Sequence, residues 1–415
     1  MTTTRRTHTT TIRPTAGAGL LAAVAITLGA AGPATADQTA APAEDGPDAP
    51  NPSGLTVVGP DGEELEPGWT MGPGLQGSAE AELDTFDEIP ATDTAEDGSP
   101  STNAIRTVGA GSESYAWTGT GVDATLVEYD HDGAAEPVAY TLDEDTDIGE
   151  AAPLDMMAHP DPNDGTVLWT AGNDEGTRLM QLDPEEGVAT EVASTADGEL
   201  GETIVGVSEG GVVTESADGS LHHSTYDGET TELAASAEEV SLPGIGEART
   251  AAYDGSTVVT TRADEGGVVV EQLDVESGGE PTEIATIEGE GLTGGDVTFD
   301  EGHAVVTVYD EQEADRAVVL DVASGEVAGV FDGQGASVSG AVQDGSLWMT
   351  AATVGGEVEP TATSGAMWRL DPETAEGEMW LDEPVSGADA SGGQLLVDEG
   401  LGGLGDSSRV ISQGQ

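Results

Sequence analysis

The sequence contains no cysteine and no lysine, and its ten basic residues are all arginine. Without cysteine the chain cannot form disulfides, carry a lipid on a thiol or use thiolates as metal ligands or nucleophiles. The ten arginines face 81 aspartate and glutamate residues. Phosphate binding requires basic patches, so nucleic acid and anionic membrane are excluded as expected partners.

The N-terminal residues have the composition of an export signal. Arg5, Arg6 and Arg13 supply the positive start, Ala16–Ala31 the apolar stretch, and Ala34–Ala36 a small-x-small cleavage site. The apolar stretch is short for a membrane-spanning helix. We therefore expect residues 1–36 to be removed and the mature protein to be secreted, extracellular and monomeric. The general secretory and the twin-arginine routes both remain open.

The mature chain would be extremely acidic. Three arginines lie in the signal, which leaves seven against 81 carboxylates and a formal charge of −74. Such a surface repels itself at low ionic strength, and salt screens that repulsion. The composition favours halophilic adaptation, with a merely acidic secreted protein as the alternative.

A unit of about 45 residues recurs from residue 105 to the C-terminus, marked by an apolar run that ends in aspartate. Intervals of 53, 44, 47, 47 and 50 residues separate these aspartates: Asp130, Asp183, Asp227, Asp274, Asp321 and Asp371. A repeat of this length, built from short apolar strands and Gly/Asp turns, is typical of a β-propeller with one four-stranded blade per repeat.

The sixth unit shows the pattern best. Period-two alternation and turn residues predict strands over Ser337–Val342, Ser346–Thr350, Ala366–Leu370 and Glu378–Leu381. The seventh unit stops one strand short, after Arg409–Ile411. We expect Leu55–Val58 to supply the missing strand, because an open sheet edge invites aggregation.

The predicted fold is therefore all-β, a seven-bladed β-propeller closed by N- and C-terminal strands together. The expected organisation is a signal peptide over 1–36, a disordered acidic segment over 37–52, a closing strand and linker over 53–104, and the propeller over 105–415.

The turn after the third strand has a recurrent form, as in Asp321–Gly325 and Asp274–Gly278. It resembles the repeats of quinoprotein-like and surface-layer-type propellers, which are related to WD-like repeats. The resemblance covers about three quarters of the chain and implies the fold without a particular activity. Propellers of this kind include quinone-dependent dehydrogenases, lyases, lactonases and pure binding proteins.

Four arginines are the candidate ligand-binding residues. Each falls at or next to the connection between the second and third strands of its unit. In a propeller these connections lie on the same face as the blade-to-blade loops. The four residues are Arg178, Arg262, Arg316 and Arg409. Four of seven mature arginines on one face could recognise an anion. The alternative is local pairing with nearby carboxylates.

Other constellations favour structural roles. Gly206–Gly210 matches a nucleophile elbow but is predicted in a strand-to-strand hairpin, where that motif does not operate. Asp143–Asp147 begins like a calcium loop yet lacks the later glycine and glutamate. The five mature histidines lack zinc-site spacing, and Trp117, Trp169 and Trp348 are expected to pack against neighbouring blades.

The sequence therefore predicts an extracellular, non-catalytic propeller that binds a protein or small-molecule ligand of unknown identity, with no assignable cofactor. The alternative is a metal-dependent hydrolase or lyase, lactonase-like, on the same scaffold. No catalytic or metal-binding residues can be named, because the abundance of carboxylates obscures any particular pair.

Overall fold

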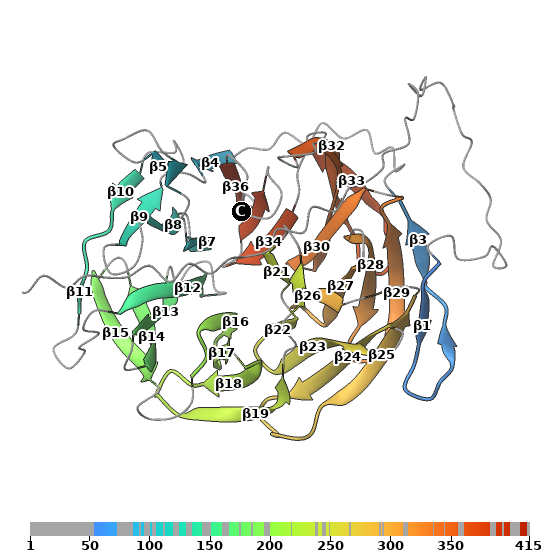
Figure 1. The fold of residues 1–415 in the computed structure, drawn as a ribbon, viewed down its shortest axis with the longest axis horizontal. Helices are drawn as coiled ribbons and strands as arrows, with labels where there is room; N and C mark the ends of the chain where they lie inside the picture. Colours follow the sequence, from blue (N-terminus) through green and yellow to red (C-terminus); the bar gives the residue numbers. More distant parts are fainter. Residues whose placement is uncertain are drawn as a thin grey trace, which may run out of the picture. The chain divides into compact units, whose positions relative to one another are not determined.

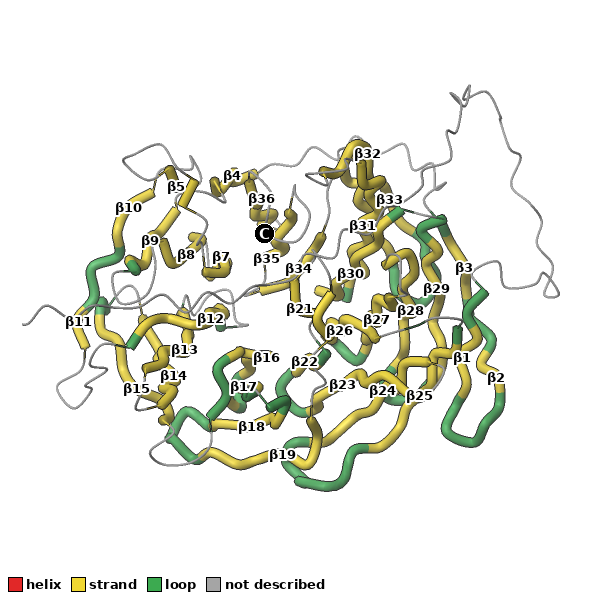
Figure 2. The backbone as a smooth tube through the Cα atoms, viewed as in Figure 1, coloured by secondary structure: helices red, strands yellow, loops and turns green. Residues whose placement is uncertain are grey.

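Strands joined by turns make up the described part of the chain (Figures 1 and 2), where no helix occurs. The computed structural model describes residues 54–72, 86–90, 93–94, 100–101, 105–110, 113–118, 124–129, 135–142, 151–159, 166–173, 176–183, 186–194, 200–216, 218–236, 240–242, 246–248, 250–264, 267–289, 292, 294–309, 314–334, 336–343, 345–355, 361–381, 387–391, 394–398 and 407–412. Within these residues no helix is long and apolar enough to cross a membrane.

The first three repeats each form an antiparallel sheet in chain order. Sheet 1 contains β7 (Ile105–Ala110), β8 (Glu113–Thr118), β9 (Thr125–Tyr129) and β10 (Ala135–Pro137). Sheet 2 contains β12 (Ala152–Ala158), β13 (Val167–Asn173), β14 (Gly176–Asp183) and β15 (Val188–Ser194), with β11 (Thr141–Leu142) added parallel to β15. Sheet 3 contains β16 (Thr203–Ser208), β17 (Gly211–Glu215), β18 (Ser220–Ser224) and β19 (Thr230–Ser236).

The next three repeats follow the same order. Sheet 4 contains β22 (Ala251–Tyr253), β23 (Thr257–Asp264), β24 (Gly267–Asp274) and β25 (Thr282–Glu288). Sheet 5 contains β26 (Gly294–Asp300), β27 (His303–Tyr309), β28 (Ala314–Asp321) and β29 (Glu326–Asp332). Sheet 6 contains β30 (Ser337–Gln343), β31 (Ser346–Gly355), β32 (Thr361–Leu370) and β33 (Gly377–Leu381), which confirms the strands predicted for the sixth unit.

The C-terminal repeat contributes three strands to sheet 7, namely β34 (Gly387–Ser391), β35 (Gln394–Asp398) and β36 (Ser407–Ser412). Two further two-stranded sheets are separate from these seven. One pairs β5 (Asp93–Thr94) with β6 (Pro100–Ser101), and the other pairs β20 (Val240–Leu242) with β21 (Gly246–Ala248).

The prediction that Leu55–Val58 completes sheet 7 was wrong. Its fourth strand is β4 (Phe86–Pro90), which pairs antiparallel with β36. The predicted strand instead forms β1 (Thr56–Val58), a hairpin with β2 (Glu64–Leu65), and lies antiparallel to β25 at the edge of sheet 4. The physical reason is burial: Val57 and Leu55 are 3% and 2% exposed in an apolar cluster shared by sheets 4 and 5.

The segment predicted as a linker holds a further edge strand. β3 (Trp69–Met71) pairs parallel with β29 of sheet 5. The Trp69 indole covers Gly329, where an added Cβ would meet the ring at 2.0 Å, and its Nε1 donates to the Pro372 carbonyl over 2.9 Å. A glycine at 329 therefore makes room for the tryptophan that anchors this strand.

Successive sheets pack on each other through shared apolar clusters. Separate clusters join sheets 1 and 2, 2 and 3, 3 and 4, 4 and 5, and 5 and 6. Trp117 and Trp169 meet edge to face, with ring centroids 5.7 Å apart, between sheets 1 and 2. Consecutive four-stranded antiparallel sheets packed face to face are the architecture of a β-propeller.

The repeated aspartate is explained by the turn it makes. The Asp321 carboxylate accepts the Ser324 amide at 2.8 Å, and its carbonyl accepts the Gly325 amide at 2.8 Å. The same two bonds recur at Asp183, Asp274 and Asp371. Hydrogen bonds from the backbone and side chain of Thr374 lower the pKa of Asp371, because they favour the charged carboxylate. The sequence marker is thus a turn-forming residue.

Candidate functional site

The four predicted arginines lie on four different sheets. Arg178 is in β14, Arg262 in β23, Arg316 in β28 and Arg409 in β36. In the strand register, Arg316 stands opposite Val308 at the second-to-third connection of sheet 5. The side chain of Arg409 is outside the described residues.

Two of these arginines bind carboxylates of their own sheets. Arg178 Nη1 lies 2.6 Å from Glu191 Oε2, and Arg262 Nε lies 3.4 Å from Glu271 Oε2. Both pairs are partly exposed to solvent, and such pairs contribute about 0–1 kcal/mol to stability. Local pairing, the alternative to anion recognition, therefore holds at these two positions.

Ser208, in the sequence that matches a nucleophile elbow, lies in the β16–β17 hairpin and is 5% exposed. Its hydroxyl accepts the Gly210 amide and donates to the Tyr253 hydroxyl, both at 3.0 Å. The Tyr253 hydroxyl donates to the Gly255 carbonyl at 2.9 Å and lies 3.4 Å from His223 Nε2. The tyrosine thus separates the serine from the imidazole, and among the described residues no base contacts the serine.

Burial also sets the protonation of this network. Desolvation lowers the pKa of His223 and raises the pKa of Tyr253, so both side chains are neutral near pH 7. A neutral, hydrogen-bonded network joins the first turn of sheet 3 to the first strand of sheet 4. It therefore stabilises the contact between two sheets rather than activating a nucleophile.

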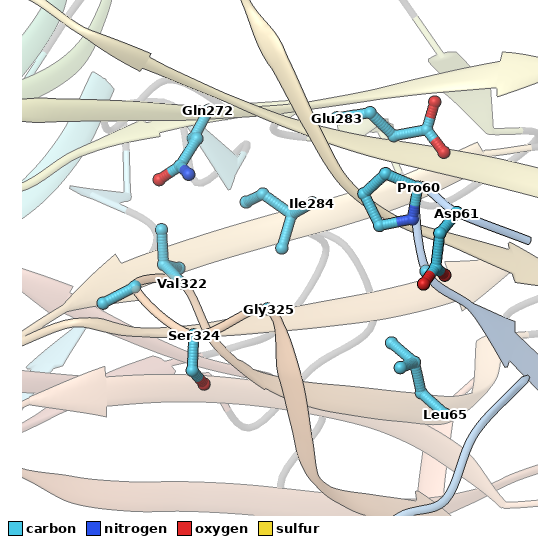
Figure 3. A pocket seen from close by; sticks show the side chains of 11 residues that line it. Pro60, Asp61, Leu65, Gln272, Glu283, Ile284, Val322, Ser324 and Gly325 are labelled. Atoms are coloured by element: carbon cyan, nitrogen blue, oxygen red, sulfur yellow. The ribbon is translucent and has the colours of Figure 1, made fainter. Parts of the chain in front are cut away.

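An open groove of about 400 Å³ lies between the β1–β2 hairpin and sheets 4 and 5 (Figure 3). The hairpin contributes Pro60, Asp61 and Leu65, while sheet 4 contributes Gln272, Glu283 and Ile284. The turn between β28 and β29, residues 322–325, closes the third side. The groove exists because the N-terminal hairpin adds to the edge of sheet 4.

The polar groups of this groove also support local structure. Asp61 Oδ1 accepts the Glu63 amide at 3.0 Å within the hairpin turn. Glu283 Oε1 accepts the Thr286 hydroxyl at 3.2 Å. Among the lining residues, no nucleophile is paired with a base, so the groove offers shape and hydrogen-bonding groups.

A second open depression, of about 360 Å³, lies at one end of sheet 6 and is lined in part by an arginine that the sequence did not single out. Ser346, Arg369, Asp371 and Glu376 provide its polar lining. Arg369 was missed because nothing in the sequence around Trp368-Arg369-Leu370 distinguishes it from a solvent-exposed strand position. The neighbouring strand β31 brings two side chains into contact with Arg369, those of Ser346 and Trp348.

Within the described residues, no group of three or more histidine or acidic side chains is arranged to hold a metal ion. The acidic loop Asp143–Asp147 and His131 lie outside these residues. His222 and His223 are on neighbouring positions of β18, so their side chains point to opposite faces, as predicted.

No protein-family model and no curated protein sequence matches the chain. Solved structures with some likeness include a chain of "Crystal Structure of Mitotic Checkpoint Complex", with 12% identity, a TM-score of 0.48 and coverage of 82% of this chain and 98% of that chain. BamB from Moraxella catarrhalis has 12% identity and a TM-score of 0.41, covering 74% and 95% of the two chains. YCF48 from Cyanidioschyzon merolae has 10% identity and a TM-score of 0.48, covering 79% and 99%. These likenesses assign neither a family nor an activity.

Proposed function

We propose that the chain is an extracellular, non-catalytic β-propeller that binds a small-molecule or protein ligand. The observation that carries the proposal is the groove in Figure 3, an open hollow between edge elements of two sheets. Its carboxylates are engaged in turn and strand hydrogen bonds, and its walls combine apolar and polar side chains. Concave and largely pre-formed surface sites with a few polar groups are typical ligand-binding sites.

The proposed architecture is a closed ring of seven blades. Three kinds of contact support it: β30 against β34, β34 and β35 against β7, and the pairing of β4 with β36. Together they link sheet 6 to sheet 7 and sheet 7 to sheet 1. In this arrangement an N-terminal strand completes the C-terminal blade.

Secretion and salt adaptation are part of the same proposal. The supporting observations are the signal-like residues 1–36 and the formal charge of −74 expected after cleavage. Arg178, Arg262, Arg316 and Arg409 remain a proposed anion-recognition set, although two of them already bind carboxylates.

Metal analysis separates binding from the metal-dependent hydrolase or lyase alternative. The protein, purified without chelators and exchanged into metal-free buffer, is measured by inductively coupled plasma mass spectrometry. We expect no stoichiometric divalent ion and no hydrolysis of lactone substrates with added zinc or calcium. One tightly held ion per chain, with lactone hydrolysis that depends on it, would overturn the proposal.

A further inference from the structure

Two consecutive histidines in β18 place one imidazole on each face of sheet 3. In the strand register His222 is in one row with Ile204, a member of the apolar cluster shared by sheets 2 and 3. His223 is in one row with Val213, a member of the cluster shared by sheets 3 and 4. Neighbouring residues of a strand point to opposite faces. Each contact of sheet 3 with a neighbouring sheet therefore contains an ionisable ring.

The His222 imidazole is buried without a partner. It is 1% exposed, and within the described residues neither ring nitrogen has a hydrogen bond or an ion pair. Hydrogen bonds from Ser220 and, to a smaller extent, the charge of His222 lower the pKa of Asp218, a carboxylate that lies in solvent outside this contact. The titratable groups on this side of sheet 3 are Asp155, His159 and Asp183 from sheet 2 and its turns, and Glu202, Asp218 and Glu232 from sheet 3. A proton on His222 would place a charge in an apolar contact, which is unfavourable.

The His223 imidazole is half-buried against sheet 4. Its Nε2 lies 3.4 Å from the Tyr253 hydroxyl, and the two rings meet with centroids 5.9 Å apart. The charged groups on this side are Glu209, Glu215 and Glu229 of sheet 3, Asp254 and Glu276 of sheet 4, and the ion pair of Arg262 with Glu271. Among the described residues no carboxylate forms an ion pair with His223. Burial lowers the pKa of His223, so desolvation outweighs these acidic surroundings.

The direction of the pH response follows from the two states of His223. An imidazole in the unfolded chain has a pKa of about 6.5, and burial lowers the pKa of His223 in the folded chain. Below about pH 6.5 the unfolded chain therefore binds more protons at this site, and the stability that the neutral ring contributes is lost as the pH falls. Protonation of carboxylates acts in the opposite direction on the rest of the chain, because it relieves their mutual repulsion.

We propose that sheet 3 is a pH-sensitive element of this protein. Proton uptake by His222 and His223 in mildly acidic solution loosens the contacts of sheet 3 with sheets 2 and 4, while sheets 5 and 6 keep their contact. The charged rings gain solvent and the exposed carboxylates of Glu232 and Asp254 only if sheet 3 separates from its neighbours. The device is built into the fold and does not depend on a ligand in the groove.

Hydrogen–deuterium exchange of the wild-type protein tests this. Exchange is measured at about pH 7.5 and about pH 5.0 in about 1 M sodium chloride, which screens repulsion between carboxylates, and is corrected for the intrinsic rates. We expect the protection of the β17, β18 and β19 amides to fall at least about tenfold on acidification, a change that one pKa unit of proton linkage produces. The amides of β27, β28 and β31 should keep their protection. An equal or larger loss in these three strands, or no loss in sheet 3, would overturn the proposal.

A variant without the two ionisable rings is the second test. His222→Leu suits the apolar surroundings of this position, and His223→Gln keeps a polar group near the Tyr253 hydroxyl. In the double variant the protection of sheet 3 at about pH 5.0 should stay within about twofold of its value at about pH 7.5, because the linked protons are gone. His303→Gln, on β27, is the control and should respond to acid as the wild type does.

Circular dichroism at about pH 7.5, where the imidazole is neutral, checks that each variant is folded. If the double variant does not fold, each single variant should show a smaller loss of protection in sheet 3 than the wild type. A folded variant that loses protection in sheet 3 as the wild type does would contradict the assignment to these two histidines.

Discussion

At the scale of single residues, the fold depends on a turn that needs one residue with positive φ. After the marker aspartates this residue is Gly187, Gly278 or Gly325, with φ of 66°, 58° and 72°. At the equivalent place in sheet 6 it is Ala375, with φ of 55°. A residue with a Cβ is strained in this region, whereas glycine is not.

Ala375→Gly should therefore stabilise the protein. Relief of the strain is offset in part by the greater freedom of glycine in the unfolded chain, so we expect a gain of about 0.5–1 kcal/mol. The free energy of unfolding, measured by urea denaturation, checks this. The reciprocal variant Gly325→Ala should lose a similar amount, since its new Cβ makes only ordinary contact, 3.6 Å from the nearest atom. A loss of stability in Ala375→Gly would contradict this account of the turn.

The repeat was predictable from sequence because four of the six marker aspartates, Asp183, Asp274, Asp321 and Asp371, form their turns locally. Asp321 and Asp371 bond to residues three and four positions ahead, so the interaction is visible in the sequence itself. Arg369 could not be found in this way. What distinguishes it is its position over Trp348 on the neighbouring strand, 5.5 Å from the guanidinium carbon to the ring centroid.

At the scale of elements, the N-terminal strands add to sheets formed by distant repeats. β1, β3 and β4 extend sheets 4, 5 and 7 respectively. Strands of three to five residues carry too little alternation to identify their partners, which explains why Leu55–Val58 was assigned to the wrong sheet. Their positions depend on tertiary contacts, such as Trp69 over Gly329.

Gly329→Ala should detach β3 from sheet 5. The added Cβ would lie 2.0 Å from the Trp69 ring, so the indole must leave its place and lose the hydrogen bond to Pro372. Hydrogen–deuterium exchange should show faster exchange of the amides of β3, with sheets 1–3 unaffected. Gly279→Ala is the control, because its Cβ would meet only the Ser277 hydroxyl at 3.8 Å. Unchanged protection of β3 in Gly329→Ala would show that the tryptophan does not anchor the strand.

At the scale of the whole molecule, the charge dominates the dependence of stability on salt. Ten arginines are too few to neutralise 81 carboxylates, and the proposed signal cleavage would leave seven, so the folded state carries strong self-repulsion that unfolding relieves. Salt shortens the screening length from about 10 Å at 0.1 M to about 3 Å at 1 M.

The thermal midpoint should therefore rise by several degrees between about 0.05 M and 2 M sodium chloride, since screening reduces repulsion at these ionic strengths. Potassium chloride should act similarly at matched pH. Sulfate is unsuitable, because it also strengthens apolar burial. Differential scanning calorimetry measures the midpoint, and a flat or falling value would remove the argument for salt adaptation.

The central structural claim is that an N-terminal strand closes the last sheet, and an engineered disulfide tests it most directly. Asp87 and Val410 stand opposite each other in the β4–β36 register, and the chain has no other cysteine to compete. Opposed strand residues lie close enough for a disulfide, which needs Cα atoms within about 7 Å. The double variant Asp87→Cys/Val410→Cys should form an intrachain disulfide on mild oxidation, seen by mass spectrometry, and gain thermal stability. Val57→Cys/Val410→Cys should remain reduced, and disulfide formation in this second pair but not in the first would contradict the account.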